Sequence, residues 1–163
     1  MDILSIREDF ITGKVDLVSF YTDVIKRIED KKELNIFLDF SKEKVMERVE
    51  FLNNKLKNKE KLGSLFGISV SVKDNILVKG YKNTCGSKIL ENYSPIFNAT
   101  IIDRLLEEDA VILGKVNMDE FAMGGSGETS YFGATKNPLD ESLIPGGSSS
   151  GSASSVSADL AMI

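Results

Sequence analysis

The residues best suited to chemistry are a lysine and a cluster of serines that lie far apart in the sequence. Lys73 lies in the segment VSVKDN over 70–75, and the serines lie in the segment PGGSSSGS over 145–152. The glycine-rich segment exposes hydroxyl and backbone N–H groups with little side-chain bulk around them. Burial lowers the pKa of a lysine, and a neutral amine can accept a proton from a serine hydroxyl. The two segments together therefore predict a serine–lysine catalytic site.

Each segment also fits a simpler interpretation. Most lysines at the end of a strand are solvated. The segment 145–152 by itself fits a flexible linker, a phosphate cradle at the start of a helix, or catalytic hydroxyls beside oxyanion-binding N–H groups. It lacks the Gly-Lys-Ser/Thr ending of a Walker A motif, which argues against a nucleotide site of that type. The other interpretations stay open on this segment alone.

The composition excludes several other kinds of site. The 163 residues contain no histidine, so neither Ser-His-Asp nor Cys-His catalysis can occur within this chain. Its one cysteine, Cys85, excludes an internal disulfide. We expect no metal site, because a lone thiol and carboxylates are poor zinc ligands. The net charge of −5 argues against a broad nucleic-acid-binding surface.

The sequence also predicts where the protein works. No apolar run approaches the roughly 20 residues that span a bilayer. The first residues lack the basic and then apolar pattern of a secretory signal. A single cysteine fits a reducing compartment. We therefore expect a cytoplasmic protein with no membrane partner.

The N-terminal part of the sequence has the pattern of two amphipathic helices. Apolar residues recur at helical spacing over 17–28, after a plausible N-cap at Asp16. A second stripe runs over 45–56, after a plausible N-cap at Ser41. A short strand is expected between them, over 35–40. We interpret this part as helices that pack against a larger body.

The strand that carries the lysine is expected from strict alternation over 68–73. Ile68, Val70 and Val72 should share one face of this strand. Lys73 should lie on the other face, with the serines, at the end of the strand. The chain would thus point the amine away from the aliphatic side.

The remaining elements alternate between helix and strand. We expect a short amphipathic helix over 101–106 and a buried strand over 110–114. A capping box at 117–120 should start another helical segment. Residues 124–147 should be mostly loop, and the small residues from Ser152 onward should form a helix that lies tightly against a sheet. This alternation predicts an α/β layered architecture.

Several segments resemble the amidase signature family, and within it the branch that serves tRNA-dependent amidotransferases. These segments are 67–76, 84–90, 112–124, 132–138 and 145–153. The resemblance implies an α/β fold with an amidase-signature-type mixed sheet flanked by helices. We expect that fold to be incomplete in this chain, with residues 1–60 as an N-terminal helical region and residues 61–163 as the N-terminal part of the amidase domain.

The resemblance also implies roles for particular residues. Lys73 would be the basic member of a serine–cis-serine–lysine triad, and Ser148 would be its bridging serine. Met123, Gly124 and Ser126 would line the substrate site. The family's acyl-forming serine lies in a later Asp-Thr/Ile-Gly-Gly-Ser-type motif, which this sequence does not contain. We therefore expect the isolated chain to be truncated before this nucleophile motif and inactive.

The implied reaction is the hydrolysis of glutamine to supply ammonia for conversion of Glu-tRNA(Gln) to Gln-tRNA(Gln). The implied partners are amidotransferase subunits B and C, with misacylated tRNA bound through the complex. No cofactor is expected in this chain, because ATP and Mg²⁺ would be used through a partner subunit. Two alternatives remain, a general amidase that acts on small amides and a non-catalytic fragment that binds partners.

Overall fold

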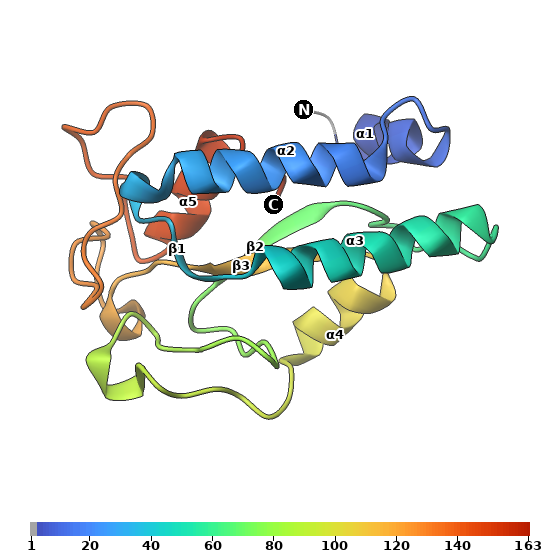
Figure 1. The fold of residues 1–163 in the computed structure, drawn as a ribbon. Helices are drawn as coiled ribbons and strands as arrows, with labels where there is room; N and C mark the ends of the chain where they lie inside the picture. The colour runs from blue at the N-terminus through green and yellow to red at the C-terminus, as the bar shows by residue number, and fades with distance from the viewer. Residues whose placement is uncertain (1–2) are drawn as a thin grey trace.

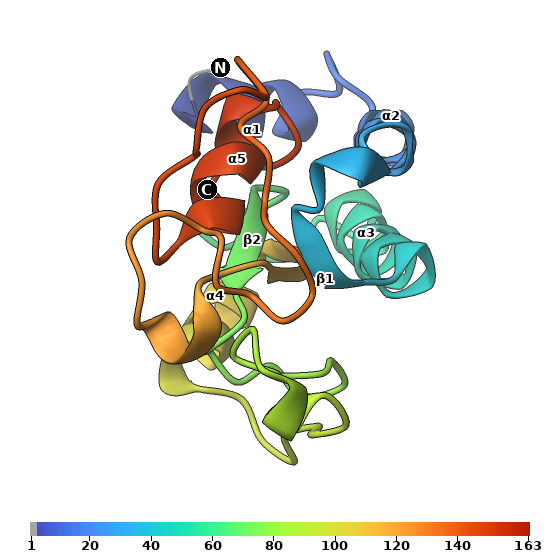
Figure 2. The same cartoon turned by 90° about the vertical axis from the view of Figure 1, so that its left-hand side faces the viewer.

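Residues 3–163 are described in a computed structural model, in which helices flank a small sheet of three strands (Figures 1 and 2). The helices are α1 (Ile3–Ile11), α2 (Leu17–Asp30), α3 (Lys42–Lys57), α4 (Thr100–Glu107) and α5 (Ser150–Ser157). The strands are β1 (Phe37–Phe40), β2 (Ser69–Lys73) and β3 (Val111–Val116). Single 3₁₀ turns occur at Lys32–Leu34, Lys88–Leu90 and Glu120–Ala122.

The sheet has the order β1-β3-β2, so β3 lies in the centre. It pairs antiparallel with β1 and parallel with β2, which makes the sheet mixed. Every residue of β3 is buried, as expected for a central strand covered on both faces. The connection from β2 to β3 passes through α4, as a parallel pair requires. This arrangement confirms the predicted α/β fold with a mixed sheet flanked by helices.

The two expected N-terminal helices are present with the expected caps. The carboxylate of Asp16 accepts a hydrogen bond from the backbone N–H of Ser19 at 2.7 Å and begins α2. The hydroxyl of Ser41 accepts one from the backbone N–H of Lys44 at 3.3 Å and begins α3. Figures 1 and 2 show α2 and α3 side by side over the sheet. The expected strand between them is β1.

Apolar side chains form two buried clusters on opposite sides of the sheet. The larger cluster joins α1, α2 and α3 to the sheet and to the residues after α5. The smaller cluster packs Ile102 of α4 against Val70, Val72 and Ile112. Ile68 belongs to the larger cluster, so the expectation that it shares a face with Val70 and Val72 is wrong. It lies just before the first residue of β2, outside the alternation of the strand.

The outer edge of β2 is covered by the last residues of the chain. The backbone N–H of Ser71 donates to the carbonyl of Ile163 at 2.7 Å. The N–H of Ile163 donates to the carbonyl of Ser69 at 3.1 Å. Ile163 thus bonds to the residues on both sides of Val70, which is the hydrogen-bond pattern of parallel strands. The chain thus returns beside β2 after α5.

The expected capping box at 117–120 is wrong. The side-chain oxygen of the predicted N-cap, Asn117, accepts from the N–H of Met118, whereas the N–H of Glu120 donates to the hydroxyl of Thr129. Only the 3₁₀ turn Glu120–Ala122 follows. The carboxylate of Asp119 accepts hydrogen bonds from residues 127 and 129, which lie in the next loop. The division between residues 1–60 and 61–163 stays a prediction, and β1 links the two parts by pairing with β3.

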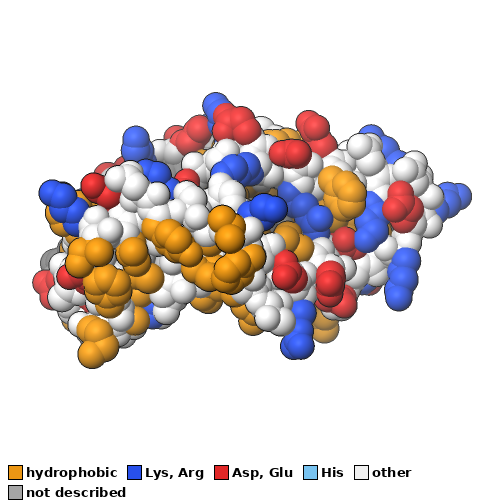
Figure 3. Space-filling model, turned by 90° about the horizontal axis from the view of Figure 1, so that it is seen from below, with side chains coloured by type: hydrophobic (Ala, Val, Ile, Leu, Met, Phe, Trp, Pro, Cys, Tyr) orange, Lys and Arg blue, Asp and Glu red, His pale blue; other side chains and the backbone are white. Residues whose placement is uncertain are grey.

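Apolar side chains are also exposed on one side of the molecule. Seen from below, they gather mainly over one half of the face, while charged side chains are more frequent on the other half (Figure 3). The connection between β2 and α4 contributes Ile89, Ile96 and Phe97, which are 81%, 83% and 58% exposed. No helix within residues 3–163 is long and apolar enough to span a membrane.

Candidate active site

The fold brings Lys73 and Ser148 together. The Nζ atom of Lys73 lies 2.8 Å from the Oγ atom of Ser148, within hydrogen-bonding distance. Lys73 is the last residue of β2, and Ser148 lies in the loop just before α5. The peptide bond between Gly147 and Ser148 is cis. Both residues of the pair are half-buried.

The chain that leaves β3 holds both members of this pair in place. Lys73 pairs with Val116 across the parallel strands. Three residues after Val116, the backbone N–H of Asp119 donates to the carbonyl of Ser148 at 3.1 Å. The end of β3 therefore fixes the amine through the sheet and the hydroxyl through a loop contact.

Small residues let α5 lie close to the sheet, as the sequence predicts. A side chain at Gly151 would collide with the backbone of Asn117, just after β3. The N–H of Gly151 donates to the carbonyl of Asn117 at 2.9 Å. Deeper in the contact, the hydroxyls of Ser71 and Ser155 lie 2.8 Å apart. These contacts set the start of α5, and with it the position of Ser148.

Asp74, the residue after Lys73, forms a fully buried ion pair with Lys115. The Nζ atom of Lys115 donates to Asp74 at 3.1 Å and to the side-chain oxygen of Asn83 at 2.8 Å. The other carboxylate oxygen of Asp74 accepts hydrogen bonds from the N–H and the hydroxyl of Thr84. The side chains of Lys115 and Asp74 are 0% and 1% exposed. This network fixes the backbone immediately after Lys73.

The surroundings of Lys73 favour its neutral form. Burial lowers the pKa of Lys73, and the negative charge of Asp119 partly opposes this effect. Burial by itself would raise the pKa of the Asp119 carboxyl, but hydrogen bonds from Thr129 and Gly127 outweigh it and lower the pKa. The site therefore contains an amine with reduced basicity and, beyond ion-pair distance from it, a carboxylate that keeps its charge.

The three residues expected to line the substrate site have different surroundings. Met123 is 82% exposed. Gly124 packs so closely on Asp119 that a side chain there would collide with the carboxylate. The backbone nitrogen of Ser126 would lie 2.8 Å from a Cβ atom built on Gly147. Gly124 and Ser126 thus lie beside the Ser148 loop, and a role of any of the three in substrate binding stays a prediction.

The sequence also matches a known family over most of its length. Residues 19–163 match the family described as Amidase. This chain belongs to the amidase family. The resemblance drawn from its motifs is thereby confirmed.

Individual relatives make the assignment finer. The amidase chain is 48% identical over 158 residues to the A subunit of glutamyl-tRNA(Gln) amidotransferase from Chlorobium chlorochromatii, covering 97% of this chain and 33% of the relative. It is 52% identical over 141 residues to the protein of the same name from Methanococcus vannielii, covering 85% and 32%. The chain thus spans about a third of the length of the curated relatives it matches.

A solved structure supports the fold. The native peptide amidase from Stenotrophomonas maltophilia matches with a TM-score of 0.91 and 29% identity. The match covers 99% of this chain and 34% of the peptide amidase chain. The helices and the mixed sheet described above therefore form an arrangement found in amidases.

Two charged residues near the pair were not predicted from the sequence. Lys115 lies in the apolar run over 112–116, and a lysine inside a buried strand is a signal that a buried partner must exist. Asp119 had a clear alternative interpretation as part of a capping box. Only the fold shows that each is fully buried.

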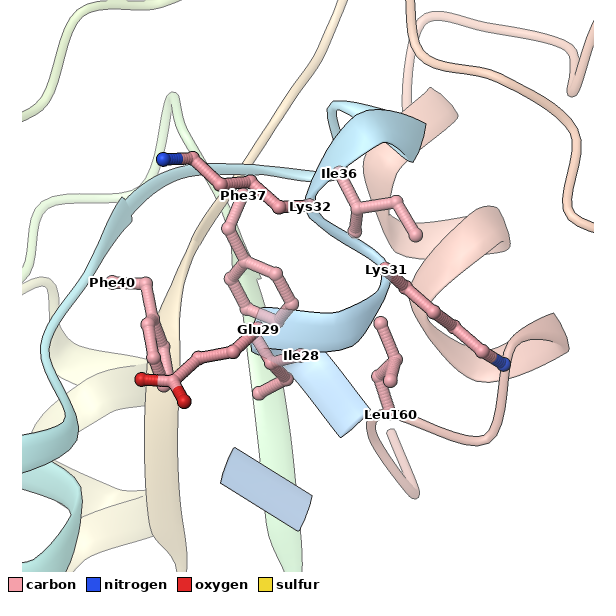
Figure 4. Close-up of a pocket in the computed structure, with 8 residues that line it drawn as sticks. All are labelled: Ile28, Glu29, Lys31, Lys32, Ile36, Phe37, Phe40 and Leu160. Carbon is pink, nitrogen blue, oxygen red and sulfur yellow. The ribbon is translucent and has the colours of Figure 1, made fainter. Parts of the chain in front are cut away.

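A cavity of about 310 Å³ lies elsewhere in this chain, between α2 and β1 (Figure 4). Its lining combines the aromatic side chains of Phe37 and Phe40 with the charged side chains of Glu29 and Lys32. Neither member of the Lys73–Ser148 pair lines it. Within residues 3–163 no group of histidine, cysteine or acidic residues is arranged to hold a metal ion.

Proposed function

We propose that this chain supplies the lysine and the bridging serine of an amide-hydrolysing site. The observation that supports this proposal most directly is the 2.8 Å distance between Lys73 Nζ and Ser148 Oγ. A lysine whose pKa is lowered by burial is a suitable proton acceptor for a hydroxyl at this distance.

In the proposed mechanism, neutral Lys73 accepts the proton of the Ser148 hydroxyl. The Ser148 oxygen in turn accepts the proton of a nucleophilic serine as that serine attacks the amide carbon. The same two groups then return a proton to the leaving nitrogen, so that ammonia departs and an acyl-enzyme ester remains. Water hydrolyses the ester by the same proton path. The nucleophilic serine belongs to a motif that these 163 residues do not contain.

The substrate we propose is glutamine, and the ammonia would serve a tRNA-dependent amidotransferase. The support is the identity of 42–52% with relatives named as the A subunit of glutamyl-tRNA(Gln) amidotransferase, compared with 29% for the peptide amidase. In such an enzyme, partner subunits B and C would complete the complex. A partner would bind ATP, Mg²⁺ and the misacylated tRNA.

The experiment uses the whole gene product, purified together with subunits B and C, and measures ammonia release from glutamine. Lys73→Met and Ser148→Ala should each lower kcat by on the order of 10²- to 10⁴-fold. Two matched control variants should leave it unchanged. Ser149→Ala removes the neighbouring hydroxyl, and Lys79→Met removes an exposed lysine shortly after β2.

The outcomes separate the candidate functions. Full glutaminase activity in Ser148→Ala would overturn the proposed role of the bridging serine. Release of ammonia from small amides but not from glutamine would favour a general amidase, which the fold shared with peptide amidase also fits. A wild-type complex without any amidase activity would overturn the proposal as a whole.

A further inference from the structure

Asp119 is a buried carboxylate that no cation neutralises directly. Its side chain lies fully buried, and no lysine or arginine within residues 3–163 comes within 4.0 Å of its oxygens. Its charge is supported by hydrogen bonds from the N–H of Gly127 at 3.0 Å and from the N–H and hydroxyl of Thr129 at 3.2 and 2.9 Å. A buried charge is costly unless it is well solvated by the protein, so this site is built to keep an anion here.

The same carboxylate lies between two loops. A side chain at Gly124 would collide with the carboxylate from one loop, and a side chain at Gly147 would collide with it from the other. The backbone N–H of Asp119 also donates to the carbonyl of Ser148 at 3.1 Å. Asp119 therefore joins the loop over 124–129 to the backbone that presents the Ser148 hydroxyl.

We propose that Asp119 is a positioning residue of the amidase site, which orients the Ser148 backbone and stabilises the ammonium form that Lys73 adopts when it accepts a proton. This inference rests on the proposed function of the Lys73–Ser148 pair. Asp119 touches neither the reacting atoms nor the amine, and it acts through Ser148 by contact and through Lys73 by charge.

The charge effect has a definite direction. The carboxylate of Asp119 raises the pKa of Lys73, against the larger effect of burial. Asp74 follows Lys73 at the end of β2, and its charge is paired with that of Lys115 at 3.1 Å. Removal of the Asp119 charge should therefore lower the pKa of Lys73 further and make the amine a weaker proton acceptor.

The decisive experiment compares Asp119→Asn with Thr129→Val in the whole complex. Asp119→Asn keeps the shape and removes the charge. Thr129→Val keeps the charge and removes the hydroxyl that donates to Asp119 and accepts from the backbone N–H of Glu120. In Asp119→Asn the acid limb of the kcat/KM profile should move to lower pH by about one pH unit, with a lower plateau. In Thr129→Val the limb should stay in place. Asp119→Ser, which keeps an oxygen in a smaller side chain, replaces Asp119→Asn if that variant does not fold.

A second measurement does not depend on activity. The pH dependence of acetic anhydride labelling at Lys73, followed by mass spectrometry, reports the pKa of the amine directly. It should fall in Asp119→Asn and stay the same in Thr129→Val. An unchanged Lys73 pKa in the charge-removing variant would overturn the inference. If instead Lys73→Met and Ser148→Ala keep full activity while the Lys73 pKa shifts, the proposed function fails and the electrostatic link stands.

Discussion

Lys73 and Lys115 are two lysines at the ends of neighbouring parallel strands, and they have opposite surroundings. Their registers differ by one residue, since Lys73 pairs with Val116 and Lys115 pairs with Val72. Lys115 is fully buried and donates to the carboxylate of Asp74. Lys73 is half-buried and lies against the hydroxyl of Ser148. A lysine paired with a carboxylate serves the fold, whereas one paired with a hydroxyl is able to exchange a proton.

The electrostatics follow the same division. Burial lowers the pKa of both amines. For Lys115 the direct ion pair and hydrogen bond to Asp74 oppose that effect and hold the ammonium form in place. For Lys73 the opposing carboxylate is that of Asp119, which forms no ion pair with it among the described residues. Both amines lose contact with solvent, so the two lysines differ mainly in how close the opposing carboxylate lies.

The largest expected effect is a loss of activity when Lys73 can no longer become neutral. Lys73→Arg keeps a positive charge, but a guanidinium does not lose its proton in proteins. We expect glutaminase kcat to fall by on the order of 10²- to 10⁴-fold, with little change in unfolding. Steady-state ammonia release and urea unfolding of the same preparation would measure both. Retained activity in this variant would contradict the role of a neutral amine.

The next effect concerns the stability of the fold. Lys115→Met leaves the buried carboxylate of Asp74 without its cation and should lower the free energy of unfolding by about 3–5 kcal/mol. Lys73→Met removes no ion pair and should change it far less. Urea unfolding of the whole protein measures the difference. The double variant Lys115→Met with Asp74→Leu should recover part of the loss, and a loss that stays the same would show that Asp74 is not the cause.

A smaller effect tests the other side of the Asp74 carboxylate. Thr84→Val removes the hydroxyl that donates to Asp74 and accepts from the N–H of Gly86, and it leaves the backbone donor of Thr84 in place. The expected loss is roughly 1.5–3 kcal/mol, typical of a hydrogen bond to a charged group. Thr22→Val on the exposed side of α2 is the matched control, since its hydroxyl bonds only to the backbone of its own helix. Equal losses of unfolding free energy in both variants would mean that the hydrogen bond to Asp74 stabilises the fold no more than an exposed one.

The smallest effect is the dependence of stability on pH. The folded-state pKa of Lys73 lies below its unfolded value of about 10.4, so the unfolded chain binds more protons between the two values. The free energy of unfolding should therefore rise with pH across that window. Lys73→Met should flatten this rise, as seen in urea unfolding over a pH series. The change is modest because Lys73 keeps part of its solvent contact.

Local signals predicted much of the fold and one half of the site. The caps at Asp16 and Ser41 and the strand that ends at Lys73 depend on residues close in sequence, and all three are present. The residue types of the two segments predicted a serine–lysine site, but the choice of Ser148 as the partner of Lys73 followed from the family resemblance, because nothing local connects residues so far apart. Helix α1 was not predicted, since its short stripe of Ile6 and Phe10 forms a stable face only against the larger cluster.

The charged residues around the site show why the rest was out of reach. The sequence around Asp119 fits a capping box, and the local pattern gives no sign that the carboxylate turns toward Gly127 and Thr129 instead. The partner of Lys115 is 41 residues away, and it becomes a neighbour only through the parallel pairing of β2 with β3. Contacts of this kind depend on the sheet order, which periodicity does not contain.

The hydrogen bonds between the last residues of the chain and the outer side of β2 have a consequence for the behaviour of the molecule in solution. An uncovered edge strand offers free N–H and carbonyl groups to other molecules and promotes aggregation. Here the N–H of Ser71 and the carbonyl of Ser69 already bond to Ile163. The strand that carries Lys73 is thereby shielded from recruitment into intermolecular sheets.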